Sequence, residues 1–166
     1  MFALLAFAAA TATNPALIKP ARPQFPTLAA SSCDDPTQRS KALTALESSM
    51  DGANSATNFN KNWSNYIDGR VAQLKMKSEE QSNFMLGLLK APEFLSILSR
   101  NDAILDQMQG DMKALEAATD ETSACKTVAH MLGLLSIMIG NAEQQWLVID
   151  GYVAAEAKRR GITLID

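Results

Sequence analysis

The chain carries a single histidine, His130, and this limits the chemistry that its side chains can perform. One histidine cannot form a His-x-x-x-His metal pair, and no Cys-x-x-Cys motif is present to bind zinc or attach haem. In a helical bundle, His130 would lie near the level of Met108 and Met112, and a His/Met pair can ligate haem iron. A haem- or metal-binding bundle of the four-helix type is therefore an alternative function, although the heptad position of His130 faces away from the core.

Acidic residues are spread along the chain without an apparent pair for acid/base catalysis. The sequence also lacks a Gly-rich phosphate loop and a Gly-x-Ser-x-Gly nucleophile motif. We therefore expect a protein that is not an enzyme and that needs no cofactor.

The most unusual composition lies between positions 54 and 66, where asparagines alternate with aromatic residues. Asparagines and aromatic residues on one helix can form a patch that binds a ligand or a partner, so we consider as a binding site Asn58, Asn62, Trp63 and Tyr66. Trp63 and Tyr66 also follow Phe59 at the spacing of a buried helix face. Helical spacing alone thus predicts that the rings belong to the core.

Two cysteines occur, Cys33 and Cys125, each near the start of a predicted long helix. If the first and last helices run in the same direction, the two cysteines lie at the same end of the bundle and can form a disulfide. The alternative is a lipidated Cys33, since Leu28 to Ser32 ends in small residues, but prolines interrupt the apolar segment that a lipoprotein signal needs.

Two long stretches repeat apolar residues at alternating steps of three and four, which predicts helices packed side by side. The first runs from Leu43 to Leu74 and the second from Cys125 to Val153. Between them lies a further apolar helical pattern that Pro92 interrupts. We predict an all-α fold, an up-down-up bundle of three long helices over residues 33–166, with the second helix broken near Pro92 and one disulfide closing the bundle.

The first 32 residues predict an export leader followed by a proline-rich linker. The apolar run from Phe2 to Ala10 and the small residues Ala10 to Ala12 match a secretory signal and its cleavage site. The run is too short to span a bilayer, so we expect no transmembrane segment in the mature chain. After cleavage the linker would be a disordered tail, because prolines at short intervals prevent helix and paired strand: Pro15, Pro20, Pro23 and Pro26.

A formal net charge of −3, from 15 basic and 18 acidic residues, provides no field that would hold a nucleic acid. We therefore predict an exported, periplasmic or secreted helical bundle that works as a non-catalytic binding or protein-interaction module of the cell envelope. Its partner is another protein or a second copy of itself.

Overall fold

A computed structural model describes residues 17–165, apart from the side chains at 42, 43, 46, 47 and 49–53. The expected leader, Phe2 to Ala10, and the first heptad positions, Leu43 to Ala53, therefore lie outside the described residues and side chains. All regular structure in the described part is helical. Its five helices are η1 (Ala30–Asp34), α1 (Pro36–Gln73), α2 (Ser78–Leu89), α3 (Pro92–Glu116) and α4 (Glu121–Arg160).

The ends of the two longest helices follow from their sequence. Asp35 precedes α1, and its Oδ1 atom accepts the Thr37 N–H at 2.8 Å. Asp120 precedes α4 in the same way and accepts the Ser123 N–H at 2.8 Å. Both aspartates bind an N–H that has no partner within its own helix. At the other end of α4, Gly161 adopts a left-handed conformation with φ of 69°, which favours glycine and ends the helix.

The all-helical prediction is confirmed, but the described residues form five helices where three were expected. One additional element is the short η1, which places Cys33 beside the helices. The other difference lies near Pro92: α2 ends at Leu89 and α3 begins at Pro92, so this part of the chain forms two helices. Proline fits the first turn of α3, where its missing N–H leaves no helical hydrogen bond unmade.

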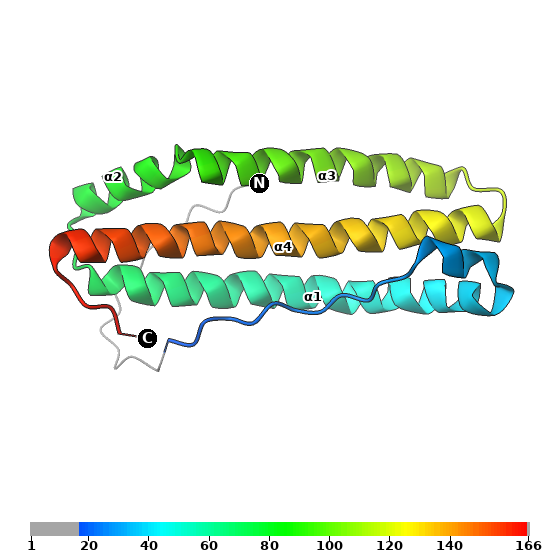
Figure 1. The fold of residues 1–166 in the computed structure, drawn as a ribbon, viewed down its shortest axis with the longest axis horizontal. Helices are drawn as coiled ribbons and strands as arrows, with labels where there is room; N and C mark the ends of the chain where they lie inside the picture. Colours follow the sequence, from blue (N-terminus) through cyan, green and yellow to red (C-terminus); the bar gives the residue numbers. More distant parts are fainter. Residues whose placement is uncertain (1–16, 166) are drawn as a thin grey trace.

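The long helices lie side by side in one layer, with α4 in the middle (Figure 1). Helix α4 packs against α1 on one side and against α3 on the other, and no comparable contact joins α1 to α3 in the described part of the chain. Figure 1 also shows that α1 and α4 run in the same direction and that α2 and α3 run in the opposite one. The layer therefore has two faces.

One face of the layer carries residues 17–29, an extended segment that we name the strap. Leu17 contacts the backbone of α1 at Gly69, where the missing side chain leaves room. Phe25 packs on the core between α1 and α4, and Leu28 packs against the disulfide. The strap is therefore ordered by its contacts, whereas the sequence predicted a disordered tail from the prolines alone. Leu17 and Phe25 lie between those prolines, and Leu28 follows the last of them.

Candidate functional site

The aromatic residues of the proposed asparagine-rich binding site lie in the core. Trp63 is completely buried and Tyr66 is 5% exposed, while Asn58 and Asn62 are exposed. The Trp63 ring stacks on the ring of Trp146 from α4, with a 3° angle between the planes. The four residues therefore do not form one surface. Their spacing places the rings on the side of α1 that faces α4, and the asparagines on the side that faces water.

A charged pair lies next to these rings and was not recognised in the sequence. The Nε atom of Arg70 on α1 lies 2.9 Å from Oδ1 of Asp150 on α4, and both side chains are largely buried. Arg70 also donates from Nη1 to the Tyr66 hydroxyl at 3.1 Å. From the strap, Lys19 lies 3.7 Å from the other Asp150 oxygen. The pair joins α1 to α4 beneath the strap, and its two members are too far apart in the sequence for any local pattern to connect them.

The structure gives His130 a carboxylate partner. Its Nδ1 atom lies 2.7 Å from Oδ2 of Asp111 on α3, and more than half of the His130 side chain is exposed. Asp111 adjoins Met112 in sequence, so His130 lies near the level of Met112 along the bundle. Met112, however, is 54% exposed and Met108 is only partly buried, so the three residues do not converge on an enclosed site. Among the described residues, no group of three or more His, Cys, Asp or Glu side chains could hold a metal ion.

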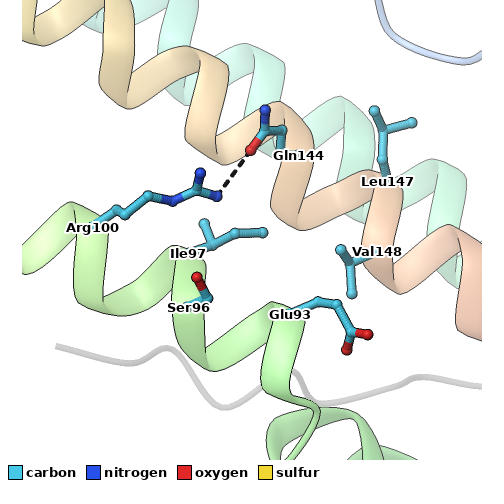
Figure 2. A pocket seen from close by; sticks show the side chains of 7 residues that line it. All are labelled: Glu93, Ser96, Ile97, Arg100, Gln144, Leu147 and Val148. Carbon is cyan, nitrogen blue, oxygen red and sulfur yellow. Dashed lines mark hydrogen bonds between the residues drawn. The ribbon is translucent and has the colours of Figure 1, made fainter.

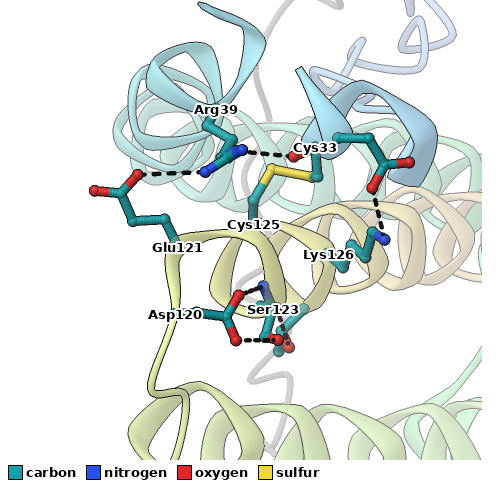
Figure 3. Close-up of a disulfide and its surroundings, with 9 residues drawn as sticks. Cys33, Arg39, Asp120, Glu121, Ser123, Cys125 and Lys126 are labelled. Atoms are coloured by element: carbon teal, nitrogen blue, oxygen red, sulfur yellow. Dashed lines mark hydrogen bonds and ion pairs between the residues drawn. A yellow bond between two sulfur atoms is a disulfide. The ribbon is translucent and has the colours of Figure 1, made fainter. Parts of the chain in front are cut away.

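The predicted disulfide between Cys33 and Cys125 is confirmed, with 5.6 Å between the two Cα atoms. It leaves no free thiol for a lipid on Cys33, so the lipidation alternative is not compatible with this structure. Figure 3 shows charged residues around it: Arg39 donates to the Cys33 carbonyl at 3.0 Å and lies 3.6 Å from Glu121. Such a bridge is typical of proteins from oxidising compartments.

A groove with a volume of about 500 Å³ lies between α3 and α4 (Figure 2). Its apolar lining combines Ile97, which is buried, with Val148 and the partly exposed Leu147. Arg100 stands at one end and donates to the Gln144 side chain at 2.9 Å. Glu93 stands at the other end of the groove in Figure 2. The floor is therefore apolar, and the two ends carry opposite charges.

This arrangement suits binding of a protein segment. An apolar side chain of a partner can cover Leu147 and Val148, which would remove apolar surface from water. A partner carboxylate can pair with Arg100, whose guanidinium presents several N–H donors, and a partner cation can pair with Glu93. The sequence analysis missed this groove because its two walls come from helices about 50 residues apart and its lining types are ordinary for a helix surface.

A smaller hollow of about 320 Å³ lies between α2 and α4. Its edge includes Glu156, which accepts hydrogen bonds at 2.6 to 2.7 Å from Arg159 and Arg160. These hydrogen bonds lower the pKa of Glu156 from an ordinary 4.5 to about 2. The carboxylate is thus occupied by its own helix, which leaves the α3–α4 groove as the better candidate for a partner.

Comparison with known proteins adds no assignment. No protein-family model, curated protein or solved structure matches this chain. One of the described helices, α4, is long and apolar enough to cross a membrane by length and composition, and 33% of its most apolar stretch is buried inside the fold. Helix α4 lies in the middle of the layer, where it packs against α1 and α3.

Proposed function

We propose that this protein is an exported, non-catalytic module of the cell envelope or extracellular space that binds another protein in the α3–α4 groove. The observation that carries the proposal is the apolar floor of Ile97, Leu147 and Val148 between Arg100 and Glu93. The Cys33–Cys125 bridge supports export, because disulfides persist in oxidising compartments. In this proposal α2 and α3 together form one long helical segment that is broken at Pro92, so that the module is an up-down-up bundle of three such segments.

The haem- or metal-carrier alternative lacks comparable support. His130 is exposed and pairs with Asp111, and Met112 points its side chain to the surface of α3. An absorption spectrum after incubation with haem, or with copper, tests this alternative directly. A Soret or copper band that disappears in His130→Ala would favour the carrier over the binding module.

The groove can be tested by site-specific photo-crosslinking in the native envelope fraction. A photoreactive residue in place of Ser96, which is exposed and lines the groove, should give one dominant protein adduct. The same residue in place of Asn58, exposed on α1, is the matched control and should not give it. Adding Leu147→Glu to the Ser96 variant should abolish the adduct, because a carboxylate would stand on the apolar floor.

Export is tested separately by intact mass under non-reducing conditions. The expected mature protein has lost its leader and two hydrogens, which corresponds to leader cleavage and one disulfide. Equal labelling from both photoreactive positions, or an adduct that survives Leu147→Glu, would contradict the assignment of the groove. A protein that keeps its leader and stays inside the cell would contradict export.

A further inference from the structure

Three of the four sides of α4 are covered by the rest of the chain. Trp146 faces α1, where its Nε1 atom donates to Asn60 at 2.9 Å. Asn141 faces α3 and donates to Asn101 at 2.9 Å. The third side faces the strap, from which Arg22 donates to the Ser136 carbonyl at 2.7 Å. These contacts define the directions around the helix, because each residue advances about 100°.

The fourth side, opposite the strap, carries a stripe of residues at alternating steps of four and three. No charged side chain interrupts it between Met131 and Ile149: Glu143 and Asp150 both lie toward the strap side, about a third of a turn away. Every member of this stripe, which we name the back stripe, is half-buried, and its residues are Met131, Leu135, Met138, Ala142, Gln145 and Ile149. Ala142 and Ile149 also pack against the core of the fold, so these two residues are partly covered by the chain itself. This spacing is the pattern of a helix that packs against another helix.

Helix α3 extends the same apolar face. Leu98, Leu105 and Met112 recur every seventh residue, on the side of α3 away from the groove-lining Glu93 and Arg100. Leu105 is 45% exposed and Met112 is 54% exposed. Asp102 and Glu116 lie beside these residues on α3 and are exposed, so the row on α3 has charged borders, whereas the stripe on α4 is uncharged from Met131 to Ile149.

The two helices that carry this face have a footprint of the size that a specific interface covers. Helix α3 has 25 residues, which makes it roughly 37 Å long at about 1.5 Å per residue. Two helices packed about 10 Å apart give a face about 20 Å wide. The product is roughly 750 Å² per copy, close to the about 800 Å² per partner of a standard specific interface.

We infer that the back stripe of α4, with its extension on α3, is the interface of a homodimer. The stripe is self-complementary when two copies of α4 cross antiparallel about a two-fold axis near position 140. Met138 then faces Ala142 of the other copy, so that a large side chain meets a small one, and Met131 faces Ile149. A two-fold interface of this kind uses the same patch on both copies.

Sedimentation of the disulfide-bonded protein at several concentrations tests the dimer, because an interface of this size gives dissociation constants at or below the micromolar range. We expect a dimer that Met138→Glu converts to a monomer, because the substitution places two carboxylates in an apolar interface. The matched control is Ile137→Glu at the neighbouring residue, which is 53% exposed and points about 100° away from the stripe. This control should remain a dimer.

Cross-linking tests the antiparallel geometry without a destabilising charge. In the antiparallel dimer, the two copies of position 142 lie about 6 Å apart along the helix axis and the two copies of position 131 about 27 Å apart. A bis-maleimide with a spacer of about 10 Å should therefore link two copies of Ala142→Cys and not two copies of Met131→Cys. No other thiol reacts, since both native cysteines are in the disulfide.

Several results would overturn the inference. A protein that stays monomeric above about 100 μM, or a dimer that Met138→Glu does not dissociate, would exclude this interface. Binding to lipid vesicles without dimer formation would identify the back stripe as a membrane contact instead. Because the α3–α4 groove lies on the opposite face, loss of the dimer leaves the proposed groove binding to be judged by its own cross-link.

Discussion

Removal of the disulfide should be the most costly change to stability among covalent perturbations of this fold. Cys33 and Cys125 are separated by 92 residues, and the loop that they close contains α1, α2 and α3. In the chain-entropy model a loop of this length stabilises the native state by about 4.6 kcal/mol, because the link restricts the unfolded chain. For a chain of 166 residues this corresponds to a fall in melting temperature of about 13 °C.

Urea denaturation followed by circular dichroism measures this loss on Cys33→Ala, Cys125→Ala and the double variant. All three lack the link, so the three free energies of unfolding should agree within about 1 kcal/mol. The two single variants also control for packing, since each retains the other buried sulfur. A loss below about 1 kcal/mol in all three would refute the reasoning, because it would mean that the link hardly restricts the unfolded chain.

Three further predictions concern the core, the strap and pH. Trp63→Ala should cost about 3 to 5 kcal/mol of unfolding free energy in urea, and Asn62→Ala less than about 0.5 kcal/mol, because only the tryptophan is buried. Gly151→Ala should stabilise α4 by up to about 1 kcal/mol, since a Cβ there meets no atom within 4 Å. Gly140→Ala should stabilise α4 less, because its Cβ would lie 3.2 Å from the guanidinium of Arg22 on the strap, and thermal unfolding of both variants measures the difference. Glu156 has a folded-state pKa of about 2 against an ordinary 4.5, so its contribution to the free energy of unfolding is complete above pH 4.5 and is lost as the pH falls toward 2. Glu156→Gln should therefore reduce the change in urea stability over that pH range by about 1 kcal/mol or less.

Helices and the disulfide could be predicted from the sequence because both depend on local or pairwise information. Apolar spacing identified the long helices, and the positions of the two cysteines at helix starts required only that the first and last helices run in the same direction. The same spacing explained why Trp63 belongs to the core. The break at Pro92 was also placed at the correct residue, because a proline fits only the first turn of a helix.

The arrangement in one layer could not be predicted, because apolar spacing shows that a helix is buried but not which helix lies in the middle. Trp63 and Trp146 are 83 positions apart in the chain, and the Arg70–Asp150 pair depends on the same packing of α1 on α4. The strap was missed for a different reason. Its prolines indicated only that no helix or sheet forms there, whereas its order comes from room left at Gly69 and from contacts with distant residues.

The central position of α4 connects these observations physically. A layer of three long helices leaves its middle helix exposed on two faces, so an apolar α4 needs two covers in addition to α1 and α3. The strap provides the first cover, and it also shields the buried pair of Arg70 and Asp150, whose charges are costly to bury without a close partner. A second copy of the chain, placed on the back stripe, would provide the other cover with the same residues on both sides. This requirement explains why α4 resembles a membrane-spanning helix in composition while its strap face carries charged residues that pair within the fold.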